Sequence, residues 1–109
     1  MSQKEVTETV FFCDLTALRP EERKRHQRVL QELGSTVEEV REIPDGYAFR
    51  HPPEGESVRR IAEFITLERL CCPFLDFTLE VAANRGPVWL HLTGPEGVKE
   101  LLRAELGFG

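Results

Sequence analysis

Hydrophobic positions along the chain follow two periods, one typical of strands and one typical of helices. Segments with alternating or short apolar runs predict five strands: 6–15, 37–43, 47–51, 77–83 and 88–93. Segments with helical spacing predict three helices: one from Pro20 to Gly34, one over 58–72 capped by Ser57 and stopped by Pro73, and one after Thr93 and Glu96 that ends near Leu106. The predicted order is β-α-β-β-α-β-β-α, within one domain that spans residues 1–109.

Two turns fix how the strands pair. Pro44-Asp45-Gly46 predicts a hairpin, because Gly46 tolerates positive φ, and the turn at 84–87 joins the last two strands. We expect those two strands to be antiparallel neighbours, with the second helix packed on their inner residues Phe77, Leu79, Val81, Val88, Leu90 and Leu92. Hairpins mixed with helices predict an α+β fold. The expected form is a two-layer sandwich, with a largely antiparallel sheet of four to five strands and about three helices, loosely ferredoxin-like.

The composition excludes several partners. A chain of 109 residues with 40% hydrophobic and 30% charged residues suits one soluble globular domain. Its net charge of −5 argues against nucleic acid as a partner, and the basic cluster at 23–28 is flanked by glutamates. No apolar run is long enough for a signal peptide or a membrane span, so we expect a cytoplasmic location and no membrane partner.

The adjacent pair Cys71-Cys72 is the strongest chemical signal, since the chain has only three cysteines. An odd number fits poorly with a disulfide framework, so the thiols are expected to be free, metal-bound or transiently oxidised. Helical spacing places Glu68 on the same core-facing stripe as Cys72. An unpaired buried charge is costly. We therefore expect Glu68 to be buried and hydrogen-bonded to a cysteine or to a basic group such as His26 or Arg69, to be protonated, or to help hold a cation.

The position of the pair at a helix C-terminus weighs against a low-pKa nucleophile, because reactive thiolates favour helix N-termini. Metal capture is compatible with that position, since the ion supplies positive charge. Adjacent thiolates suit a soft ion of low coordination number better than tetrahedral zinc. Cys13 adds a third sulfur if its strand neighbours the end of the second helix. His26, His51 and His91 are the candidate nitrogen donors, although a satisfied core histidine is the simpler interpretation of His26. The candidate metal ligands are thus Cys71, Cys72, Glu68, Cys13 and His26, for Hg, As or Zn; no residue is assigned a catalytic role.

Three segments carry a family resemblance: 43–50 (IPDGYAFR), 68–77 (ERLCCPFLDF) and 89–99 (WLHLTGPEGVK). They resemble a family of small bacterial proteins of unknown function with a Glu-x-x-Cys-Cys-Pro-Phe signature. Related segments accompany, or are fused to, metal-responsive regulators of the mercury-resistance type. The resemblance implies a link to soft-metal or thiol stress and supplies no established activity.

Three hypotheses follow. The first is a soft-metal or metalloid-binding accessory domain that uses the vicinal cysteines. The second is a dithiol redox protein or small enzyme with Glu68 as base. The third is an interaction module, for example of a homodimer, whose cysteines are only core packing. Accessible thiols beside Glu68 favour the first two, and thiols enclosed by Phe64, Phe74 and Phe77 favour the third.

Overall fold

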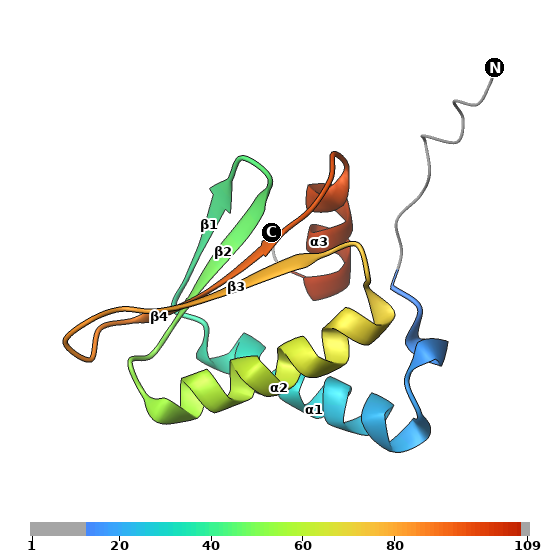
Figure 1. Ribbon diagram of the computed structural model, residues 1–109, viewed down its shortest axis with the longest axis horizontal. Helices are drawn as coiled ribbons and strands as arrows, with labels where there is room; N and C mark the ends of the chain where they lie inside the picture. Colours follow the sequence, from blue (N-terminus) through green and yellow to red (C-terminus); the bar gives the residue numbers. More distant parts are fainter. Residues whose placement is uncertain (1–12, 108–109) are drawn as a thin grey trace.

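Helices cover one face of an antiparallel sheet in the computed structural model, which describes residues 13–107 (Figure 1). The described elements run in the order η2 (Leu15–Ala17), α1 (Pro20–Thr36), β1 (Glu39–Ile43), β2 (Gly46–His51), α2 (Gly55–Cys71), β3 (Asp76–Val81), β4 (Val88–Thr93) and α3 (Val98–Leu106). The predicted α+β class is confirmed: the described part of the chain forms three α-helices and a four-stranded antiparallel sheet.

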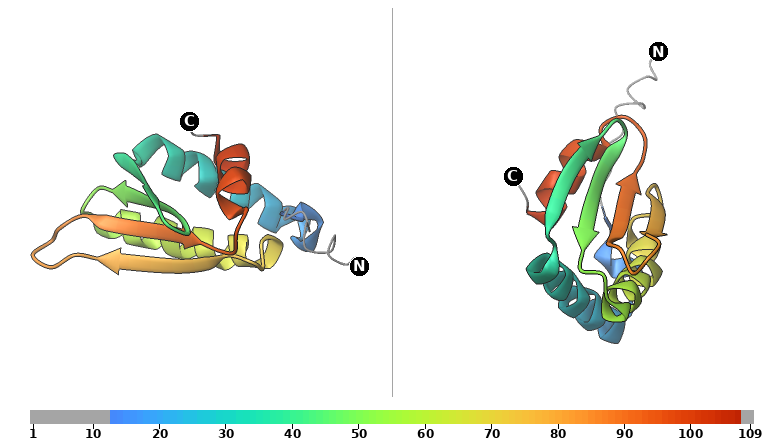
Figure 2. Two further views of the ribbon diagram at one scale, coloured as in Figure 1. Left: turned by 90° about the horizontal axis from the view of Figure 1, so that it is seen from above. Right: turned by 90° about the vertical axis from the view of Figure 1, so that its left-hand side faces the viewer.

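The strands lie in the order β1-β2-β4-β3, and every neighbouring pair is antiparallel. The expected pairing of the last two strands is confirmed, with Phe77 opposite Leu92 and Leu79 opposite Leu90. Helices α1 and α2 pack side by side beneath the sheet, and α3 packs against β2 (Figure 2). This places the C-terminal end of α2 next to α1 and to the segment around η2.

The inner face of the sheet carries the apolar side chains. Val88, Leu90 and Leu92 of β4 are buried, as the alternation predicts, while Phe77 and Leu79 of β3 are partly buried. Val81 was expected to be buried with them, and it is 56% exposed. Val81 is the last residue of β3, which is an edge strand, whereas its partner Val88 lies in the interior strand β4 and is buried.

Predicted element boundaries needed correction at several ends. Helix α1 continues through Gly34 to Thr36, where the Val37 amide closes the last turn on the Leu33 carbonyl. Helix α2 begins at Gly55, so Ser57 lies inside its first turn rather than at its N-cap. Helix α3 begins only at Val98, because residues 94–97 form a turn whose Gly97 has φ 97°.

The first predicted strand, 6–15, lies mostly outside the described residues. Its last part is not a strand, because Asp14 instead caps η2 by accepting a hydrogen bond from the Thr16 amide. Leu18, just after η2, is buried in the core and fixes this segment against the helices.

Gly46 is required in the β1–β2 hairpin for a different reason from the one predicted. It is not among the described residues with positive φ. Gly46 lies opposite Thr93 of β4, and a Cβ at this position would collide with the Leu92 carbonyl oxygen. The close approach of β4, not the turn conformation, therefore excludes a side chain here.

Candidate metal and thiol site

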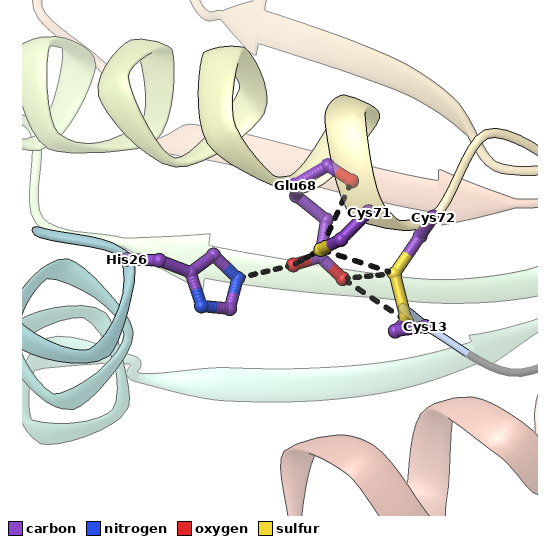
Figure 3. The surroundings of a disulfide bond; sticks show 5 residues. All are labelled: Cys13, His26, Glu68, Cys71 and Cys72. Atoms are coloured by element: carbon purple, nitrogen blue, oxygen red, sulfur yellow. Dashed lines mark hydrogen bonds and ion pairs between the residues drawn. A yellow bond between two sulfur atoms is a disulfide. The ribbon is translucent and has the colours of Figure 1, made fainter. Parts of the chain in front are cut away.

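The last turn of α2 brings three chemically active side chains to one place. It carries Glu68 and Cys71, and Cys72 follows as the C-cap, with its amide bonded to the Glu68 carbonyl at 2.8 Å. His26 reaches the site from α1, and Cys13 reaches it from the segment before η2 (Figure 3). The Asp14 amide donates to the Cys71 carbonyl at 2.8 Å, which holds that segment on the end of α2.

A disulfide joins Cys13 to Cys72, which lie 59 residues apart in sequence with a Cα–Cα distance of 4.6 Å (Figure 3). Cys71 is a free, buried thiol. Of the three thiol states expected from the sequence, the structure therefore shows the oxidised state for two cysteines and the free state for the third. The vicinal pair itself is not bonded, and the partner of Cys72 is the distant Cys13.

Glu68 is the centre of the cluster. It is 4% exposed, and its Oε1 lies 2.6 Å from Nε2 of His26. Its Oε2 lies 3.1 Å from Sγ of Cys72 and 3.9 Å from Sγ of Cys13. The prediction that Glu68 is buried and within reach of a histidine and a cysteine is confirmed. Arg69, the other partner considered, is exposed.

The contact between Glu68 and Cys72 depends on protonation. A disulfide sulfur has no proton to donate, and an ionised carboxylate is only an acceptor. The 3.1 Å contact is therefore a hydrogen bond only when Cys72 is a thiol or when Glu68 is protonated. The geometry suits the reduced site, in which the Cys72 thiol donates to Glu68.

Cys71 lies beside this pair without being bonded to it. Its Sγ is 3.8 Å from Sγ of Cys72, and it donates to the Glu68 carbonyl at 3.6 Å. Burial, and then the negative charge of Glu68, raise the pKa of the Cys71 thiol to about 12. The expectation that Cys71 is not a low-pKa nucleophile is confirmed, and burial is the first cause.

His26 is both a core residue and a partner of Glu68. Its ring stacks on Phe64 of α2, with centroids 6.1 Å apart, and it is 9% exposed. The second carboxylate that senses Glu68 is that of Glu105 in α3: desolvation, and then the charge of Glu68, raise its pKa, although Glu105 itself is exposed. His26 is thus the basic group that accompanies the buried Glu68.

Within residues 13–107, two groups of side chains have the spacing needed to hold a metal ion. One comprises Cys13, Glu68 and Cys72, and the other comprises His26, Glu68 and Cys71; in each, the ligand atoms lie within 4.8 Å of one another. All five predicted ligand residues are thereby brought together, with Glu68 shared by both groups. Sequence reasoning missed the pairing of Cys13 with Cys72, for which no motif spacing gives a signal.

The accessibility of the thiols is mixed. Cys71 and Cys72 are buried in the same apolar cluster as Phe64, as the packing hypothesis requires. Cys13 is only partly buried, and a packing role does not explain a carboxylate among the sulfurs. The cluster is therefore a polar site with one partly exposed cysteine.

Comparison of the chain with protein-family models, with curated proteins and with solved structures found no match. Among residues 13–107, no helix combines the length and the apolar character needed to cross a bilayer. A functional assignment must therefore be argued from the geometry of the site.

Proposed function

We propose that the reduced protein is a soft-metal or metalloid-binding domain in which Cys13 and Cys72 supply two thiolates and Glu68 lies beside them as an oxygen ligand. One observation carries the proposal: the two sulfurs and a Glu68 carboxylate oxygen lie within 4.8 Å of one another, although Cys13 and Cys72 are 59 residues apart. Side chains that are distant in sequence converge here without forming an ordinary apolar contact.

The donor set favours soft ions. Thiolates select ions such as mercury, arsenic or zinc over the hard ions that prefer oxygen ligands alone. Sulfur ligands must lose their protons to bind an ion. Burial disfavours the negative charge of the resulting thiolates, and a bound cation compensates for it. The family resemblance to proteins found beside mercury-resistance-type regulators supports the same class of ion.

Cys13 and Cys72 are better candidates than the vicinal pair. The Cys71 thiol has its pKa raised to about 12, so it gives up its proton less readily than an ordinary thiol. Cys13 is also partly exposed, so an ion can reach it from solvent. The second group, with His26 and Cys71, shares Glu68 with the first and surrounds the proposed ligands.

Native mass spectrometry of phosphine-reduced, desalted protein tests the proposal, with Zn²⁺, Hg²⁺ and arsenite as probes. We expect one ion per chain in the reduced protein and none in the oxidised protein, whose Cys13 and Cys72 thiols are consumed. Cys13→Ser and Cys72→Ser should each lose most of the affinity, because one thiolate cannot reproduce a two-sulfur chelate.

Cys71→Ser is the matched control, since it removes an adjacent sulfur and keeps both proposed thiolates. It should bind as wild type does, to within about threefold, and affinity should fall as pH falls because protons compete for the sulfurs. If Cys71→Ser loses the ion and Cys13→Ser keeps it, the chelate is the vicinal pair. Absence of binding by the reduced wild type to all three probes would end the metal assignment.

A further inference from the structure

The two sulfurs of the disulfide differ in their surroundings. Cys13 is partly exposed, whereas Cys72 is 0% exposed and packs in the core cluster. A thiolate that opens a disulfide must reach the sulfur that it attacks, and the other sulfur leaves. Access therefore makes Cys13 the sulfur that an external thiol attacks, and Cys72 the sulfur that leaves.

The leaving sulfur is generated next to a carboxylate. A Cys72 thiolate would lie 3.1 Å from Oε2 of Glu68, inside the core, where a second negative charge is costly. Protonation of the sulfur removes that cost. Once protonated, the Cys72 thiol donates to Oε2 of Glu68, as in the reduced site described above.

We propose that the Cys13–Cys72 disulfide is a reversible thiol–disulfide exchange site, in which Cys13 forms the mixed disulfide with an external thiol and the buried Cys72 is the leaving sulfur. This inference does not depend on ion binding. It concerns how the disulfide opens and closes, and its chemical partner is a low-molecular-weight thiol of the glutathione class.

The exchange balances in two steps. The incoming thiolate forms a bond to Cys13 Sγ as the Cys13–Cys72 bond breaks, the bonding electrons leave on Cys72 Sγ, and that sulfur takes a proton from water. A second thiolate then attacks the external sulfur of the mixed disulfide and releases Cys13 as a thiolate, which takes a proton from water. Two external thiols are oxidised to one disulfide, and the protein disulfide is reduced to two thiols.

Cys71 does not compete with the external thiol, although its Sγ lies 3.8 Å from Sγ of Cys72. It keeps its proton at neutral pH, and attack on Cys72 would give a strained ring between adjacent residues.

Mixed-disulfide trapping identifies the exchanging sulfur. Cys72→Ser, with glutathione disulfide and EDTA at neutral pH, should form a glutathione adduct at Cys13, located by peptide mass mapping. Cys13→Ser should react at least tenfold more slowly, because its two remaining thiols are buried. Equal rates in the two variants, or an adduct at Cys72, would overturn the assignment of Cys13.

Discussion

At the scale of single residues, burial has its clearest chemical effect on Cys71. Its pKa is raised from 9.0 to about 12, first by burial and then by Glu68. The unfolded chain therefore loses this proton at lower pH than the folded chain. The contribution of the protonated Cys71 thiol to the stability of the fold is fully present below pH 9 and is lost as pH rises from there toward about 12.

As pH rises from 9 to about 12, we expect the free energy of unfolding to fall by a few kcal/mol more in wild type than in Cys71→Ser. This is the order of magnitude that a pKa shift of this size implies. Serine has no group that titrates there, and the variant keeps the Cys13–Cys72 disulfide. Urea unfolding of both proteins at matched pH values measures the difference. Parallel stability curves for the two proteins would show that Cys71 ionises as readily in the folded chain as in the unfolded one.

The pair formed by Glu68 and His26 makes a second prediction. Removing one partner of a buried hydrogen-bonded pair leaves the other unsatisfied, at a cost of about 1–3 kcal/mol. We expect Glu68→Ala to lower the free energy of unfolding by that amount, and Glu68→Gln to cost less because its amide oxygen still accepts from His26. Urea unfolding checks both variants.

Glu63 supplies the control for this prediction. It lies on α2 and pairs with Arg25, 3.5 Å away, while 39% of its side chain is exposed. Because exposed ion pairs contribute about 0–1 kcal/mol, Glu63→Ala should change stability little. A cost for Glu68→Ala no larger than that for Glu63→Ala would mean that Glu68 is solvated.

Helical periodicity predicts which residues of α2 face the site, but not which residues of other elements they contact. The helical spacing of Glu68 correctly predicted that it is buried, because a regular helix fixes which face each residue occupies. The choice of His26 over Arg69 as its partner could not follow from α2 alone. It depends on how α1 packs against α2, which is a tertiary contact.

At the scale of elements, Gly34 is the point where local rules and the fold disagree. Glycine near a helical run predicts a C-terminus, yet α1 includes Gly34 and ends at Thr36. Gly34 lines an apolar cavity of about 250 Å³ between the helices and the sheet, and nothing lies within 4 Å of a Cβ built on it. The helical conformation is therefore compatible with alanine at this position.

We expect Gly34→Ala to raise the free energy of unfolding by about 0.5–1 kcal/mol, since alanine restricts the unfolded chain and favours the helix. Thermal and urea unfolding measure the gain. Gly46→Ala is the contrasting variant: its Cβ would collide with the Leu92 carbonyl oxygen, so it should destabilise the sheet. A loss of stability in Gly34→Ala would place the end of α1 at Gly34, as the sequence alone suggests.

Element types were predicted better than element ends. The strand alternation over 77–83 and 88–93 gave the correct antiparallel pair, because one face of that hairpin is buried. The start of α3 was missed because the Gly94 amide bonds to the Asp45 carbonyl of a distant hairpin. That contact holds residues 94–97 in a turn and displaces the helix start from the local capping signal at Thr93.

At the scale of the whole molecule, the Cys13–Cys72 disulfide ties the segment around η2 to the end of α2. No local pattern predicts this link, because its partners are 59 residues apart and an odd cysteine count argues against a framework. A cross-link of that span should stabilise the fold by about 4 kcal/mol on the chain-entropy account. We therefore expect reduction to lower the free energy of unfolding by about that amount, measured by urea unfolding with and without a phosphine reductant.

Hydrogen exchange is the measurement that locates the part of the chain stabilised by the disulfide. The Asp14 amide, bonded to the Cys71 carbonyl at 2.8 Å, should lose protection on reduction, while the amides paired between β2 and β4 should keep theirs at low denaturant. Cys13→Ser should reproduce the reduced pattern without reductant, and Cys71→Ser, which keeps the disulfide, should match oxidised wild type. If reduction leaves both the stability and the Asp14 amide unchanged, the disulfide does not constrain the fold. The contacts of Leu18 with the core would then be sufficient to hold this segment against α2.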